Sequence, residues 1–147
     1  MSAEERTTYE NGMTVRRQVL GDEHVDRATT RVTELDRSFQ QWITENVWGH
    51  LWTDPTLDHR TRSMITVAIL AALGREELAL HVRASARTGV TDAELAQVLQ
   101  HVAVYAGVPA ANHAFAVAKA ERPGGAAAAL PWSSAAPTKQ HNGQDES

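Results

Sequence analysis

The 147-residue chain contains no cysteine. This absence excludes disulfide bonds, thiolate metal sites and thiol redox chemistry. Aromatic residues are also scarce, at 5% of the sequence, and the apolar side chains are mostly Ala, Leu and Val. Because Ala and Leu are strong helix formers that allow close packing, this composition favours helices over a sheet.

An excess of positive charge is missing as well, since the net charge is −4 and the pI is near 5.9. No global positive field draws the chain to nucleic acid or anionic lipid, so we expect neither a nucleic-acid nor a membrane partner. No apolar run approaches the roughly 20 residues that span a bilayer. Residues 1–6 are too polar for a secretory signal. We therefore expect a soluble, cytoplasmic protein.

The chain length and composition predict one helical domain followed by a tail. We place the domain at residues 1–120, a length typical of a single domain. Residues 121–147 are rich in Ala, Gly, Pro and Ser. Such a segment buries too little apolar surface to offset the entropy of ordering it, so we expect a mostly disordered tail. Residues 130–132 can alternatively dock on a neighbour.

Apolar spacing and capping residues predict an all-α fold of about six helices, and no segment alternates like a half-buried strand. The expected helices are residues 9–20 before Gly21, 36–52, 59–73 between Asp58 and Gly74, 76–88 before Gly89, 92–106 after the capping box Thr91/Glu94, and a final helix from Pro109 to residue 119. Residues 64–73 are apolar on nearly every side. We expect this segment deep in the core or at a subunit contact.

His81 is the first candidate for chemistry. On the helix expected at 76–88 it falls on the side of Leu78 and Val82, with Arg83 and Arg87 opposite. A histidine among apolar neighbours can be an acid or base tuned by burial, or a core histidine bonded to a backbone carbonyl. Spacing alone favours the core interpretation.

Arg62 lies at the edge of an apolar stripe, where a guanidinium is costly unless it meets an anion. Its expected partner is Glu45, Asp58 or a substrate anion. Arg60 points away from the stripe and is expected in solvent.

Other polar or aromatic groups share helix faces. Glu45 lies within two turns of Trp48 and Trp52, and it is either an orienting carboxylate or a surface residue. The tryptophans are more typical of a core or interface than of a ligand platform. His101 and Tyr105 are four residues apart and stack on one flank. That flank is a proton relay or a polar seam at an interface.

Motifs for other chemistries are missing. No two histidines have i, i+4 spacing and there is no His-Glu-x-x-His, so no metal site is predicted. There is also no Gly-rich phosphate loop before a helix and no Gly-x-Ser-x-Gly nucleophile elbow.

Read as strings, the residues resemble the carboxymuconolactone decarboxylase family over roughly residues 8–120. The matching strings are Tyr9-Glu10-x-Gly12-x-x-x-Arg16-Arg17-x-Val19-Leu20-Gly21, Ile43-Thr44-Glu45-x-x-Trp48-Gly49-x-Leu51-Trp52-x-x-Pro55-x-Leu57-Asp58-x-Arg60-Thr61-Arg62-Ser63, Leu73-Gly74-Arg75-Glu76-Glu77-x-x-x-His81-Val82-Arg83, Gly89-Val90-Thr91 and Tyr105-Ala106-Gly107-Val108-Pro109-Ala110-Ala111-Asn112. The wider superfamily contains peroxidases with Cys-x-x-Cys-x-x-His. Arg75 and Leu78 occupy those cysteine positions here, which excludes that activity.

The resemblance implies an all-helical homo-oligomer, a trimer or hexamer. It also implies a lyase that needs no metal or cofactor. Its substrate would be the dicarboxylate lactone 4-carboxymuconolactone, converted to 3-oxoadipate enol-lactone and CO2 in the protocatechuate branch of the β-ketoadipate pathway.

We assign hypothetical roles within that reaction. Arg62 would bind substrate carboxylate, with Arg60 or Arg83 supplied at the rim by another subunit. His81 would be the general acid or oxyanion donor. The further candidates are Tyr105 as a donor, Glu45 as an orienting base, and Trp48 and Trp52 as an apolar wall.

Two alternatives stay open. One is decarboxylation of another lactone or a β-keto acid, for example as a tailoring step of secondary metabolism. The other is a non-enzymatic helical oligomer that acts as a scaffold or ligand-binding module.

Overall fold

The computed structural model of the chain describes residues 1–125, in which helices are joined by turns and loops and there is no strand. The elements are α1 (Ala3–Leu20), α2 (Asp22–Thr30), α3 (Arg37–Trp42), the π-helix η1 (Ile43–Leu51), α4 (His59–Leu73), α5 (Leu78–Arg87), α6 (Asp92–Ala106), α7 (Val108–Glu121) and the short 3₁₀ helix η2 (Pro123–Gly125). The all-α class is confirmed. Apart from its first five residues, the expected tail at 121–147 lies outside the described residues.

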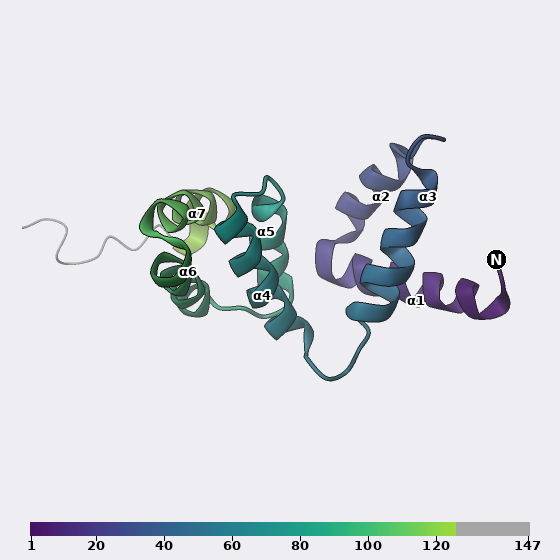
Figure 1. Cartoon of the computed structure of the whole chain (residues 1–147), viewed down its shortest axis with the longest axis horizontal. Coiled ribbons are helices and arrows are strands. Elements are labelled where there is room, and N and C mark those ends of the chain that lie inside the picture. The colour runs from purple at the N-terminus through teal and green to yellow at the C-terminus, as the bar shows by residue number, and fades with distance from the viewer. Residues whose placement is uncertain (126–147) are drawn as a thin grey trace, which may run out of the picture.

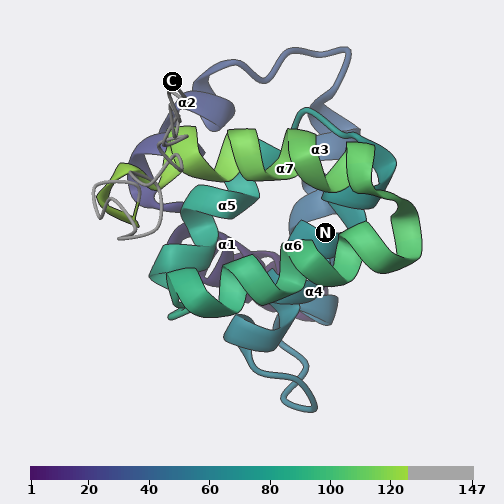
Figure 2. The same ribbon diagram turned by 90° about the vertical axis from the view of Figure 1, so that its left-hand side faces the viewer.

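The helices form two groups. Figure 1 shows α1, α2, α3 and η1 on one side and α4 to α7 on the other, with residues 52–58 crossing between them. Helix α5 packs against α4 and α7 within its own group and against α1 of the other group. Figure 2 shows α6 and α7 running side by side across the second group. The α1–α5 contact is therefore a main junction between the two groups.

Several helix ends follow the sequence signals. Asp58 caps α4 by accepting the Thr61 N–H at 2.7 Å, and Gly74 ends the helix in the left-handed region at φ 63°. Thr91 and Glu94 form the expected reciprocal capping box of α6. The signals for these helix ends are local in sequence. At each of the two helix starts, a side chain within three residues satisfies free backbone N–H groups of the first turn.

Other boundaries differ from expectation. The first helix begins at Ala3 rather than residue 9, because Ser2 and Glu5 form a capping box. Helix α2 was not expected. Residues 36–52 do not form one α-helix, since α3 gives way to η1 at Ile43. The helix expected at 76–88 begins only at Leu78, so the acidic residues Glu76 and Glu77 precede it.

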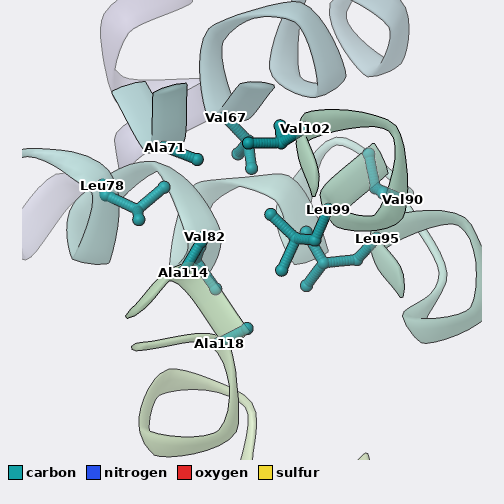
Figure 3. Packing of buried hydrophobic residues seen from close by; sticks show 10 residues of the cluster. All are labelled: Val67, Ala71, Leu78, Val82, Val90, Leu95, Leu99, Val102, Ala114 and Ala118. Atoms are coloured by element: carbon teal, nitrogen blue, oxygen red, sulfur yellow. The ribbon is translucent and has the colours of Figure 1, made fainter. Parts of the chain in front are cut away.

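Two clusters of buried residues hold the fold together. The larger joins α4, α5, α6 and α7 and is drawn in Figure 3; its members are Val67, Ala71, Leu78, Val82, Val90, Leu95, Leu99, Val102, Ala114 and Ala118. The smaller joins α1, α2, η1 and α5 through Val19, Leu20, Val25, Trp48, Trp52 and Ala84. Because α5 contributes to both clusters, burial on its two sides fixes the two helix groups against each other.

One face of α4 stays uncovered in the single chain. Val67 and Ala71 are fully buried, but Ile65, Ile69 and Leu73 are 44%, 52% and 59% exposed. The segment expected deep in the core or at a subunit contact is thus buried on one side only. No helix within the described part of the chain is long and apolar enough to span a bilayer.

Candidate functional site

Three shallow recesses surround η1 and the segment that follows it. The first is lined by Trp52, Arg60 and neighbouring residues, the second by Arg62, and the third by Glu45. Asp54 and Leu57 line both the first and the second recess. The structure therefore gathers four of the residues proposed from sequence around one π-helix and its C-terminal loop.

Arg62 is buried, at 9% exposure, in the first turn of α4. Its Nη2 donates to the backbone carbonyl of Asp54 at 3.1 Å, and the Asp54 carboxylate lies 3.9 Å away. The partner is thus Asp54 rather than the expected Glu45 or Asp58. The Arg62 Nε has no partner within residues 1–125. The guanidinium anchors the loop through Nη2, while its Nε is buried without a partner among these residues.

Arg60 and Arg83, the other two arginines proposed from sequence to bind substrate, already have carboxylate partners. Arg60 forms an ion pair with Glu94 and is half-buried rather than free in solvent. Arg83 forms an ion pair with Glu121 at the end of α7. A substrate carboxylate at either position has to compete with an internal one.

Trp48 and Trp52 belong to the core more than to an open surface. Each is 4% exposed, and their rings pack with centroids 5.0 Å apart. Trp52 also faces the His59 ring, and His59 Nε2 lies 3.0 Å from the Trp52 carbonyl oxygen. Trp52 lines the Arg60 recess, and Trp48 packs behind it.

The side chains of Glu45 and Tyr105 are held by fewer contacts than those of Trp48 and Trp52. Glu45 accepts from the Gln41 side chain at 2.8 Å and lines its recess with Asn46 and His50. Tyr105 is 79% exposed on α6 and stacks on His101 with ring centroids 4.7 Å apart. Tyr105 lines none of the three recesses, so within one chain it does not join them.

His81 lies on α5 and is half-buried. Its Nδ1 is buried and has no hydrogen-bond partner among the described residues. Burial lowers the pKa of His81, the Glu77 carboxylate opposes this shift, and the charge of His24 adds to it. The pKa of His24 is itself lowered, first by burial and then by the charges of Arg16, Arg27 and Arg83. At neutral pH the His81 imidazole is therefore uncharged.

His81 and Arg62 lie toward opposite ends of the α4–α5 hairpin. The Thr88 hydroxyl donates to Ser63 at 2.7 Å, which places the end of α5 beside the start of α4. His81 is seven residues before Thr88, or roughly 10 Å along the helix axis. The imidazole and guanidinium paired in the sequence hypothesis are thus not adjacent in one chain.

A further pocket was not expected from sequence. It has a volume of about 380 Å³ and lies between α1, α2 and α3. Arg16 lines it and is buried at 9% exposure. The available signal was that Arg16 shares a helix face with Gly12, Val19 and Leu20, a pattern that places a charge on a buried face. Within residues 1–125 no group of three or more His, Asp or Glu side chains is arranged to hold a metal ion.

Comparisons with known proteins agree with this architecture. Residues 37–120 match the model of the carboxymuconolactone decarboxylase family. The chain is 42% identical to 4-carboxymuconolactone decarboxylase of Acinetobacter baylyi over 81% of its own length and 88% of that protein. It is 37% identical to nitrosuccinic acid decarboxylase npaB of Metarhizium robertsii, over 76% and 79% of the two chains. A 4-carboxymuconolactone decarboxylase sequence of Pseudomonas putida is 44% identical over 31% of this chain and 96% of its own length.

Proposed function

This chain belongs to the carboxymuconolactone decarboxylase family, and we propose that it converts 4-carboxymuconolactone to 3-oxoadipate enol-lactone and CO2. The observation that carries the proposal is the 42% identity with the Acinetobacter baylyi enzyme, which extends over most of both chains. A likeness of this extent covers both helix groups rather than one motif.

The proposed reaction needs no external electron acceptor. The bond between the ring carbon and the departing carboxylate breaks, and its electron pair moves through the conjugated double bond to the lactone carbonyl oxygen. A proton then adds to ring carbon, so one carboxylate and one proton become a C–H bond and CO2. Because the electron sink lies within the substrate, the protein has to supply binding, a proton and donors for the transient oxyanion.

We propose His81 as the group closest to the proton transfer. Its buried, unpartnered Nδ1 and lowered pKa describe a neutral imidazole at physiological pH. A neutral imidazole can donate its N–H to an oxyanion or relay a proton, but it does not arrive carrying the extra proton. The role of a charged general acid is therefore less suitable for His81 than that of an oxyanion donor or relay.

The remaining residues have supporting roles in this proposal. Arg62 is a candidate carboxylate partner because it lines the second recess, and Trp52 supplies apolar wall near Arg60. Glu45 can orient a donor at the third recess. Trp48 acts through packing on Trp52. Arg60 lines the first recess but is paired with Glu94. Arg83 and Tyr105 contribute to a substrate site only if a second subunit brings them to it.

A homo-oligomer, a trimer or hexamer, is part of the proposal. The exposed face of Ile65, Ile69 and Leu73 on α4 supports it, because a contiguous apolar helix face of this kind is typical of a subunit contact. Analytical ultracentrifugation tests this part, and a single species at the 16.0 kDa monomer mass would contradict it.

The second candidate substrate class follows from the fungal relative named for nitrosuccinic acid. Like the lactone, nitrosuccinate is a dicarboxylate with an electron-withdrawing group close to one carboxylate. Measuring kcat/KM on both compounds separates the two functions. We expect the lactone to be preferred by at least roughly tenfold, since the 42% relative acts on it. Preference for nitrosuccinate would select the alternative, and no turnover of either compound would favour a non-enzymatic oligomer.

A further inference from the structure

Arg16 differs from the other buried arginine in what surrounds its charge. Of the two arginines buried within residues 1–125, Arg62 has the Asp54 carboxylate nearby, whereas no carboxylate pairs with Arg16 in this range. Its Nη1 donates to the Thr44 hydroxyl at 3.4 Å, and its Nε has no partner. Burial lowers the pKa of Arg16, yet a guanidinium stays charged at any physiological pH. An unpaired buried cation of this kind is costly unless an anion meets it.

The position of Arg16 is set by its neighbours. The Thr44 hydroxyl donates its own proton to the Gln40 carbonyl at 2.9 Å, so its oxygen is free to accept from Arg16. Thr44 lies on η1, and α1 crosses η1 closely at Gly12. The guanidinium is thus held at Nη1 by Thr44, and no residue among those described accepts from Nη2 of this pocket-lining arginine.

The pocket beside Arg16 has the size and lining of a small-molecule site. Its volume of about 380 Å³ falls in the range of small-ligand pockets. Arg37 adds a second cation, which pairs with Glu34 within residues 1–125. The lining also contains the polar residues Tyr9, Thr29, Gln40, Gln41 and Thr44 and the apolar residues Met1, Met13 and Val32. This is a positive, partly apolar pocket without a lining carboxylate among the described residues.

We propose that this pocket binds a carboxylate of the substrate, with the Arg16 guanidinium as its principal partner. The inference rests on the proposed function, which supplies a dicarboxylate lactone as the ligand. It places the substrate between α1, α2 and α3, where Arg16 is the buried cation of the pocket lining. This pocket shares no lining residue with the recess of Arg62, so Arg16 is a substrate-binding residue with a site of its own.

The test compares Arg16→Gln with Arg17→Gln. Arg17 is the adjacent arginine, but it faces outward and pairs with Asp22 and Asp26. For each folded oligomer we would measure KM for 4-carboxymuconolactone and, by calorimetry, Kd for adipate, a dicarboxylate that has no lactone to decarboxylate. We expect Arg16→Gln to raise both values by roughly tenfold or more, as for loss of a charge-assisted hydrogen bond. Arg17→Gln should change neither by more than about twofold.

The conservative variant and a crystal structure complete the design. Arg16→Lys keeps the charge but loses the two-pronged geometry, so it should recover part of the affinity that Arg16→Gln loses. If Arg16→Gln does not fold, crystals of the wild-type protein soaked in adipate test the proposal instead. A carboxylate hydrogen-bonded to Arg16 supports the proposal, and adipate bound only at Arg62, or nowhere, overturns it.

The two proposals fail in different ways. A wild-type protein that decarboxylates the lactone, with KM and Kd unchanged in folded Arg16→Gln, keeps the proposed function and overturns the Arg16 site. A wild-type protein that is inactive on the lactone but binds adipate through Arg16 overturns the proposed reaction and keeps a carboxylate site.

Discussion

Gly12 on α1 lies against the backbone of Thr44 on η1 so closely that a Cβ at Gly12 would be 2.2 Å from the Thr44 carbonyl oxygen. The same added atom would lie 2.7 Å from the Gly49 backbone nitrogen. Backbone atoms cannot move aside as a flexible side chain can. The α1–η1 crossing, and with it the approach of Arg16 to Thr44, therefore requires glycine at this position.

We expect Gly12→Ala to destabilise the protein by roughly 1–3 kcal/mol, the usual cost of overpacking a site whose neighbours are rigid backbone. Asn11→Ala, at an exposed position one residue earlier, is the matched control and should be nearly neutral. Urea denaturation of both variants measures the effect. Equal midpoints for the two variants would show that α1 and η1 separate at little cost.

His81→Ala should lower kcat by roughly 100-fold, the usual contribution of a positioned proton-transfer group. His113→Ala is the control, because His113 is an exposed histidine on α7. Circular dichroism has to show both variants folded. Turnover of His81→Ala close to that of the control would remove His81 from the mechanism.

The half-buried histidines His24 and His81 predict that stability falls in mild acid. Burial lowers the pKa values of His24 and His81 in the folded protein relative to the unfolded value of about 6.5. The unfolded state thus binds more protons below about pH 6.5, so the free energy of unfolding decreases as the pH falls through this value toward the folded pKa. Above about pH 6.5, the two histidines do not make the free energy of unfolding depend on pH.

Denaturant midpoints measured at a series of pH values check this dependence. The double variant His24→Gln/His81→Gln should lose part of the slope between about pH 6.5 and the onset of carboxylate titration. His113→Gln, which replaces an exposed histidine on α7, is the matched control. An unchanged slope in the double variant would contradict the assigned burial.

Much of this fold is predictable because its signals are local. Asp58, Gly74 and the Thr91/Glu94 box act within a few residues, and each marks a helix end correctly. The site is harder, because it depends on contacts between distant segments. The partner of Arg62 is fixed by how the 53–58 loop returns to α4, and the burial of Arg16 depends on α1 crossing a π-helix. Nothing in the 3.6-residue spacing of residues 36–52 indicates that the helix widens at Ile43.

Arg62→Ala should lower the melting temperature, since the anchor of the loop at the Asp54 carbonyl is lost and a cavity remains. If Arg62 also binds substrate, as proposed, KM for the lactone rises by roughly tenfold. Asp54→Asn serves as the comparison, because it removes the carboxylate 3.9 Å from Arg62 but keeps the backbone carbonyl. A lower melting temperature with unchanged KM would give Arg62 a structural role only.

The proposed reaction is tested most directly by following CO2 release from 4-carboxymuconolactone with purified protein that has been treated with a chelator and dialysed. We predict one CO2 for each lactone consumed and an undiminished rate after the treatment. A protein that is folded and oligomeric but releases no CO2 from this substrate would contradict the account.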